Sequence, residues 1–197
     1  MAPCEDGSVV VEQDANRPLR ADAQRNRARV LETAEQVFVA EGLSVRVDEI
    51  ARRAGVGVGT VYRHFPTKDA LFEAIVTDRV QWLVDEARSL GAGDDPGGAF
   101  FRYLHDVVEL AAVNKWIFDA LTGTGRDARK LVELGGQFRE ALGELLARAQ
   151  AAGAVRDDVS VTDLKGLLTG AQVAVRDGAV GGVVADVLCT GLRSPPG

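Results

Sequence analysis

The stretch that decides the fold lies at residues 48–71 and reads Asp48-Glu-Ile-Ala-Arg-Arg-Ala-Gly-Val-Gly-Val-Gly-Thr-Val-Tyr-Arg-His-Phe-Pro-Thr-Lys-Asp-Ala-Leu71. Its pattern predicts two short helices, at about 47–54 and 58–65, joined by a tight turn through residues 55–57. The apolar side chains spaced to pack these helices against each other are Ile50, Ala51, Val56 and Val61. Two short helices that meet across a tight turn indicate a helix-turn-helix.

The ends of these helices carry their own signals. Acidic residues at 48–49 lie in the first turn of the first helix and arginines at 52–53 in its last turn, an arrangement that complements the helix dipole. Pro66 ends the second helix, because the residue before a proline disfavours the helical conformation. Thr67 is expected to cap the helix that follows.

The second helix of the pair is too short to be stable alone and too polar to be core. Its outward face carries Thr60, Tyr62, Arg63 and His64. Hydroxyl, guanidinium and imidazole groups suit phosphate oxygens and base edges in the major groove of DNA. Gly57 leaves the first backbone N–H groups of the helix uncovered, and Gly59 lets the backbone approach a phosphate closely. Lys68 is unfavourable in the first turn of the next helix unless it faces an anion, which a DNA phosphate would supply.

Many positions in this stretch follow one known pattern: Ile50, Ala51, Ala54, Gly55, Val56, Gly59, Tyr62, His64, Phe65, Thr67, Lys68 and Leu71. With these positions, residues 21–75 resemble the DNA-binding region of the tetracycline-repressor (TetR) family. The resemblance implies phosphate contacts for Thr60, Tyr62, Thr67 and Lys68, and places at or near the bases for Val58, Gly59, Arg63 and His64. It also implies a homodimer that binds double-stranded DNA at an inverted-repeat operator.

Two positions depart from the family pattern. Gly57 stands where serine is common, which removes a side-chain cap and one phosphate donor. Arg46 stands where threonine or proline is common, which adds a candidate phosphate contact and leaves the cap of the first helix of the pair undefined.

Several candidate residues also have a structural alternative. Tyr62 either holds a phosphate or packs on the preceding long helix, and His64 either lies near the bases or buttresses the turn. Arg25, Arg27 and Arg29 either form a solvated face or include a phosphate contact, for which we select Arg25. Phe65 and Leu71 are expected in the core.

The rest of the chain is helical in pattern. Val30, Leu31, Ala34, Val37 and Phe38 form one apolar stripe on a helix that ends near Gly42. Further helices are predicted at 67–90, 97–113, 115–122, 127–152, 161–177 and 181–192. Because no strand pattern is convincing, the sequence predicts an all-α protein of about nine helices. We divide it into a flexible N-terminal tail (1–20), a three-helix DNA-binding domain (21–66) and a helical ligand-binding and dimerisation domain (67–197).

The net charge of −6 is unevenly distributed along the 197 residues: residues 1–14 carry −4, residues 15–68 carry +4 and residues 69–197 carry −6. A basic segment before an acidic remainder fits a DNA-binding head on an acidic body. No apolar run approaches the roughly 18–20 residues that span a membrane, and no secretory signal is evident. Cys4 and Cys189 show neither a metal-binding nor a disulfide spacing. A cytoplasmic protein without metal or cofactor is therefore expected.

The C-terminal half contains two candidate surfaces. The aromatic side chains and one histidine between the fourth and seventh helices either form plain core or line a pocket for a small, mostly apolar effector: Trp82, Phe101, Tyr103, His105, Trp116, Phe118 and Phe138. The last two helices either close the monomer core or form a dimer interface through Leu164, Leu168, Ala171, Val175, Val184, Val187 and Leu188.

Three other functions compete with a ligand-released repressor. An enzyme is disfavoured, because no carboxylate–histidine pair, activated nucleophile, phosphate loop or metal spacing is present. An interaction protein whose helix-turn-helix no longer binds DNA would lack salt-dependent DNA affinity. A regulator that activates, or that senses nothing, has the same sequence features as a repressor. We predict a sequence-specific DNA-binding transcriptional regulator, a repressor that a ligand releases from its operator.

Overall fold

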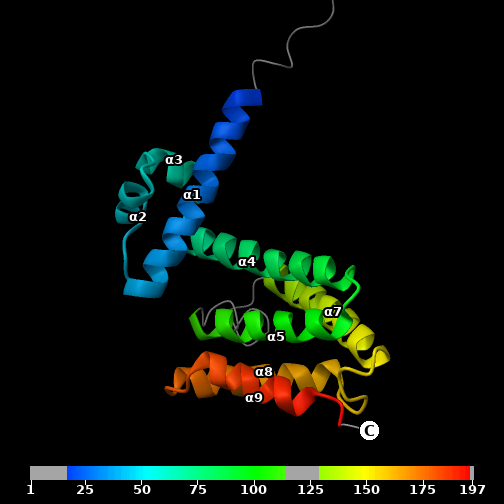
Figure 1. The fold of residues 1–197 in the computed structure, drawn as a ribbon. Helices are drawn as coiled ribbons and strands as arrows, with labels where there is room; N and C mark the ends of the chain where they lie inside the picture. Colours follow the sequence, from blue (N-terminus) through cyan, green and yellow to red (C-terminus); the bar gives the residue numbers. More distant parts are fainter. Residues whose placement is uncertain (1–16, 114–128, 196–197) are drawn as a thin grey trace, which may run out of the picture. The chain divides into compact units, whose positions relative to one another are not determined.

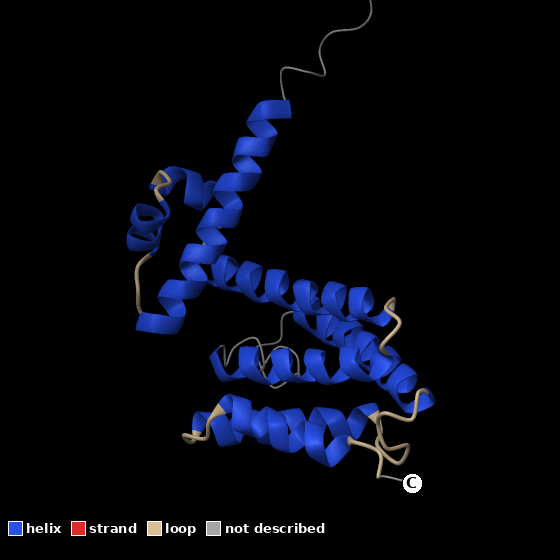
Figure 2. Cartoon of the chain, in the orientation of Figure 1, coloured by secondary structure: helices blue, strands red, loops and turns tan. Residues whose placement is uncertain are grey.

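The computed structural model describes residues 17–113 and 129–195 (Figure 1). The helices in these ranges are α1 (Arg17–Glu41), α2 (Val47–Ala54), α3 (Val58–His64), α4 (Lys68–Gly91), α5 (Pro96–Val113), α7 (Arg129–Ala151), α8 (Val161–Arg176) and α9 (Gly181–Leu192). Figure 2 shows no strand in this described part of the chain, and an isolated antiparallel bridge joins Val155 and Arg193. The all-α prediction is confirmed, and the predicted helix at 115–122 lies outside the described residues. None of the described helices is long and apolar enough to cross a membrane.

Glycines close two helices as their local signals predict. Gly42 follows α1 with φ of 79° and Gly55 follows α2 with φ of 65°, the left-handed conformation that glycine adopts without strain. The sequence predicted a flexible tail over residues 1–20. In the structure α1 already begins at Arg17, so residues 17–20 are helical. Pro18 is tolerated in the first turn, where backbone N–H groups have no partner within the helix.

The chain divides into two compact units, Met1–Phe72 and Glu73–Gly197. The division falls inside α4, six residues beyond the predicted boundary at residue 66. The first turn of α4 lies in the first unit, where Lys68 donates hydrogen bonds to the backbone carbonyls of Leu43 and Val45. Sequence periodicity did not indicate this contact, which joins residues more than twenty positions apart.

The first unit is built on the apolar stripe of α1. Val30, Leu31, Ala34, Val37 and Phe38 are all buried, as their spacing predicts. α1 contacts both α2 and α3, and α2 contacts α3. The small side chain of Ala51 is fully buried in α2, beside the fully buried Ile50. We refer to this three-helix unit, with the first turn of α4, as the head.

The second unit is organised around α5, which contacts α7, α8 and α9. The buried hydroxyl of Tyr103 in α5 donates a hydrogen bond to the carbonyl of Leu83 in α4, with an oxygen–oxygen distance of 2.9 Å. Burial, followed by the charge of Glu86, raises the pKa of Tyr103, so the hydroxyl keeps its proton and remains a donor. α5 therefore bonds to or packs on every other described helix of this unit.

Candidate nucleic-acid interface

The turn between α2 and α3 is held by backbone hydrogen bonds. The N–H groups of Gly55 and Val56 donate to the carbonyls of Arg52 and Ala51, at 3.2 and 3.0 Å. Gly57, with φ of −61°, is the residue directly before α3 and supplies no side-chain cap. Val61 in α3 is fully buried and Phe65, which follows the helix, is also buried. These two residues dock a short helix on the head and leave its other side open.

The open side of α3 carries the side chains that the sequence assigned to DNA. Tyr62 is 44% exposed, which disfavours the alternative that it packs on α1. Arg63 and His64 are exposed, and Thr60 is half-buried. Val58 is an exposed apolar side chain at the start of the helix. The structure thus brings these predicted contacts together on one short helix.

Gly59 also lies on this open side. A Cβ added there would meet no atom within 4 Å, so packing within the chain does not require a glycine at this position. A glycine that internal packing leaves unexplained fits the close approach of an outside partner.

The arginines of α1 differ in their surroundings. Arg25 forms an ion pair with Asp22, and Arg29 donates to the side chain of Asn26 at 2.6 Å. Arg27 instead lies with its guanidinium carbon 5.6 Å from the centre of the Phe65 ring, beside the residue that closes α3. Arg25 was the arginine chosen from the sequence, whereas the structure places Arg27 beside Phe65, directly after α3. The sequence contains a signal for this placement: Arg27 lies four residues before Leu31 and therefore on the same side of α1 as the apolar stripe.

Arg46 and Thr67 lie at the starts of two other helices. The Arg46 side chain is 84% exposed, and its guanidinium is 3.1 Å from a carboxylate oxygen of Asp48. Arg46 offers no side-chain cap to α2. Thr67 accepts a hydrogen bond from the N–H of Ala70 at 3.0 Å, which confirms the predicted cap of α4.

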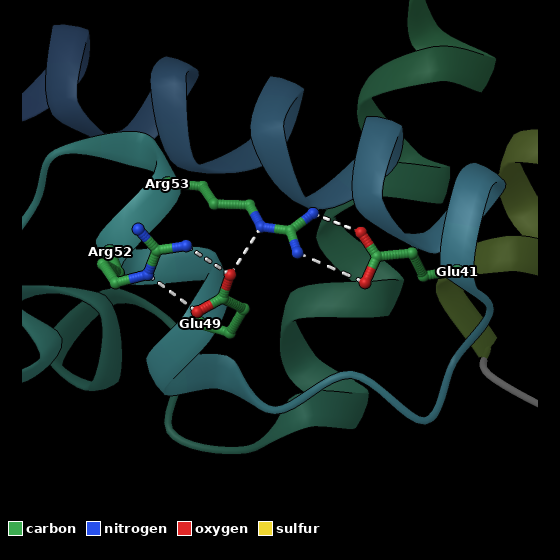
Figure 3. Close-up of polar contacts among 4 residues, drawn as sticks. All are labelled: Glu41, Glu49, Arg52 and Arg53. Atoms are coloured by element: carbon green, nitrogen blue, oxygen red, sulfur yellow. Dashed lines mark hydrogen bonds and ion pairs between the residues drawn. The ribbon is translucent and has the colours of Figure 1, made fainter.

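A network of ion pairs fastens α2 to the end of α1 (Figure 3). Arg53 bonds to Glu41 at the end of α1 and, at 2.7 Å, to Glu49 one turn before it in α2. Arg52 donates two hydrogen bonds to Glu49, at 2.8 and 2.6 Å. These bonds from Arg52, followed by that from Arg53, lower the pKa of Glu49 from 4.5 to about 2. Glu49 therefore stays ionised in the folded head at pH values where an unfolded chain takes up a proton.

This pKa difference makes the head sensitive to acid. A carboxylate whose pKa is lowered by folding contributes stability above its unfolded pKa and loses that contribution as pH falls to the folded pKa. We expect the stability of the head to decline between pH 4.5 and about 2, and Glu49→Gln to flatten this decline. Thermal unfolding at pH values from 4.5 to about 2, monitored by amide exchange in α2, measures this decline. Glu32→Gln, at an exposed site of α1, is the matched control, and an equal flattening by both variants would contradict the assignment.

The aromatic residues predicted to line a pocket are not equivalent. Phe101, Tyr103 and Phe138 are buried in the second unit, and the rings of Tyr103 and Phe138 are 6.4 Å apart. Trp82 is 45% exposed, and His105 is half-buried, 3.8 Å from a carboxylate oxygen of Glu109. Trp116 and Phe118 lie outside the described residues. The three buried rings belong to the core of the unit.

A cleft is present elsewhere in the second unit. It has a volume of about 630 Å³ and lies between the α7–α8 turn and the segment after α9, where Gln150, Arg156 and Arg193 help to line it. None of the predicted pocket residues lines this cleft.

The predicted dimer residues of α8 and α9 differ in how deeply they are buried. Leu164, Leu168 and Ala171 are buried within the chain, so their apolar stripe contributes to the core of the single chain, the alternative given for these helices above. Val175, Val184 and Leu188 are half-buried, and Val187 is exposed. The large apolar side chains of this segment that are exposed are Leu167, Val173, Val180, Val183 and Val187, and we call this set the α8–α9 face. The spacing of apolar residues identifies apolar stripes on a helix. It does not show which of these stripes is buried within the single chain.

The fold and the exposed polar side of α3 define the class of the protein, that of helix-turn-helix DNA-binding proteins. Residues 30–75 match the family model described as bacterial regulatory proteins, tetR family, and residues 95–194 match that of the transcriptional regulator SbtR-like C-terminal domain. The chain belongs to the TetR family of transcriptional regulators, as its helix-turn-helix pattern predicted.

Several known regulators are similar to this chain over most of its length. A TetR transcription regulatory protein from Mycobacterium vanbaalenii is 51% identical, with a TM-score of 0.71 over 89% of this chain and 99% of that one. The TetR transcriptional regulator SCO0520 from Streptomyces coelicolor is 32% identical, with a TM-score of 0.66 over 86% and 99% of the two chains. The HTH-type transcriptional regulator SrpR from Pseudomonas putida is 29% identical over 78% of this chain and 76% of its own length. These likenesses support a DNA-binding transcriptional regulator.

Proposed function

We propose that the protein is a repressor that binds an inverted-repeat operator as a homodimer and that a small, mostly apolar ligand releases it. The observation that carries DNA recognition is the side-chain distribution of α3. Val61 is fully buried, whereas Tyr62, Arg63 and His64 are exposed beside a glycine that internal packing does not require. A short helix docked by one face and polar on the other suits the major groove.

The proposed contacts form two groups. Phosphate contacts, which position the head without reading sequence, are assigned to Arg25, Arg46, Thr60, Tyr62, Thr67 and Lys68. Base contacts, which select the operator, are assigned to Val58, Gly59, Arg63 and His64. To the first group we add Arg27, because its guanidinium lies over Phe65 at the end of α3.

The dimer is proposed to form through the α8–α9 face. This set of exposed apolar side chains lies in and directly before the last two described helices, and exposed apolar side chains are suited to pairing with the same residues of a second copy. Two heads related by a twofold axis would meet successive major grooves, which accounts for an inverted-repeat operator.

The ligand site is proposed to lie beside Trp82 of α4, which is partly exposed, whereas Phe101, Tyr103 and Phe138 are buried in the core of the second unit. Apolar and aromatic linings select ligands of the same character. Such a ligand releases the operator only if it binds the DNA-free arrangement of the heads more tightly than the DNA-bound one. The regulator is proposed to act in the cytoplasm, by binding and not by catalysis.

Selection from a randomised DNA duplex pool, at two salt concentrations, tests this function. We expect an enriched inverted repeat with wild-type protein and relaxed preference at one symmetric pair of positions with Arg63→Ala. If Arg63 bonds a base edge with two hydrogen bonds, discrimination at those positions falls by about 1–3 kcal/mol per contact. Arg102→Ala, at an exposed arginine of α5, is the matched control. No enrichment from an intact protein would refute sequence-specific binding, and unchanged selectivity with Arg63→Ala would refute only that contact.

A further inference from the structure

One large apolar side chain lies on the open side of α3, among residues that are otherwise polar or glycine. Val58, the first residue of the helix, is 38% exposed. Val61, three residues later, is fully buried and docks the helix on the head. The other residues to which the proposed function assigns base contacts are Gly59 and the exposed Arg63 and His64. Packing within the head therefore accounts for Val61 and leaves part of Val58 facing outwards.

Val58 stands between two glycines, so no adjacent side chain shields it. A Cβ added at Gly59 would meet no atom within 4 Å, and one added at Gly57 would meet only the hydroxyl oxygen of Thr60, at 3.8 Å. Packing in the head thus leaves room for a side chain at both positions. Across residues 57–59 the isopropyl group of Val58 is the only side chain that an approaching surface can touch. The glycine on each side lets that surface approach the backbone closely.

The chemistry of valine limits what Val58 can select in the major groove. Its side chain has neither a hydrogen-bond donor nor an acceptor. All four bases present hydrogen-bonding groups in this groove, and thymine alone adds an apolar group, the C5-methyl. Contact between this methyl and the isopropyl group removes apolar surface of both from water. A polar base edge or a phosphate covered by valine would instead lose its water without gaining a hydrogen bond. Val58 therefore favours thymine by attraction and disfavours the other bases by desolvation.

We propose that Val58 is a specificity-determining residue of the head: its exposed isopropyl group selects thymine at one symmetric pair of operator positions through contact with the C5-methyl group. The inference rests on the proposed binding of α3 in the major groove, and it names the base that Val58 selects there. It is separate from the contact assigned to Arg63, because a methyl group is recognised without hydrogen bonds.

The experiment uses the full chain and the DNA duplex that selection from the randomised pool enriches. Each thymine of this duplex is replaced in turn, in both half-sites, by 2′-deoxyuridine, which lacks the C5-methyl group and keeps the base pair. Affinity at one fixed salt concentration is measured for the wild type, Val58→Ala and Val39→Ala. Val39 is the matched control, because it is a valine of the same unit, 40% exposed, that lies in α1 outside the proposed contacts.

We expect removal of the methyl group at one symmetric pair of positions to weaken wild-type binding by about fourfold per half-site, and by about 15-fold for the duplex, the scale of one buried apolar carbon group. Val58→Ala should bind the thymine duplex more weakly and should lose no further affinity at that pair, because it lacks the two methyl groups that contact thymine. This non-additivity is the signature of two groups in direct contact. Val39→Ala should respond to each replacement as the wild type does.

Three other outcomes would overturn the inference in different ways. If the wild type binds every deoxyuridine duplex as tightly as the thymine duplex, no methyl group is recognised. If Val58→Ala loses as much affinity as the wild type at each methyl-sensitive pair, another residue recognises that methyl. Both results leave sequence-specific binding through α3 intact. If the selection enriches no operator, the proposed function itself fails, and the role of Val58 fails with it.

Discussion

Val187→Asp is expected to convert the proposed dimer to a monomer and to weaken binding to the proposed operator by about 10²- to 10⁴-fold, the gain that linked binding sites typically provide. Val187 is 66% exposed in the single chain, and Val183, one turn before it in α9, is 59% exposed. A carboxylate placed between two such faces would be desolvated without a partner. The twofold axis of a dimer would introduce it twice.

Size-exclusion chromatography with light scattering, together with operator binding, measures this effect. The variant chain should remain folded, because Val187 is exposed in it. Ala147→Asp adds the same charge at an exposed site of α7 and should leave both mass and affinity unchanged. If Val187→Asp remains dimeric with wild-type affinity, the α8–α9 face is not the interface.

Phe65→Ala is expected to unfold the head and abolish DNA binding while the protein stays dimeric. Phe65 is buried directly after α3 and supports the Arg27 guanidinium on its ring. Truncation of a buried phenylalanine costs about 3–5 kcal/mol, a large part of the roughly 5–15 kcal/mol that stabilises a typical domain. The second unit keeps its own core, so dimerisation should survive.

Amide exchange resolved along the chain, together with molecular mass in solution, tests this separation. Protection should be lost in residues 22–72 and kept in α5, α8 and α9. Val58→Ala, at an exposed site on the same short helix, should preserve the stability of the head. Loss of protection along the whole chain would show that the two units do not unfold separately.

Local signals were sufficient for much of the fold. Gly42 and Gly55 end their helices because each can adopt positive φ, and the apolar spacing of α1 identifies the stripe that the head buries. Thr67 caps α4 through a bond to a residue three positions away. Each of these features depends on neighbours within about one or two helical turns, which a sequence displays directly.

Contacts between residues far apart in the chain could not be predicted from the sequence. The spacing of Leu164 and Leu168 marks an apolar stripe in α8, but their burial in the monomer depends on the helices that cover them. Phe101, Tyr103 and Phe138 are equally compatible in sequence with a pocket and with a core, and packing places them in the core. Lys68 in sequence suggested a phosphate, whereas its acceptors in the structure are carbonyls more than twenty residues earlier in the chain.

The sequence by itself determined the all-α fold class, the positions of α2 and α3, and membership of the TetR family, because each follows from periodicity, helix-end residues and one local motif. Only the tertiary structure decided that Tyr62 is turned to solvent, that Arg27 lies over Phe65, and that Lys68 binds the α1–α2 connection. The physical reason is the range of the interactions. Helix starts and stops are set by hydrogen bonds a few residues apart, whereas burial and the partner of a charge depend on segments that folding alone brings together.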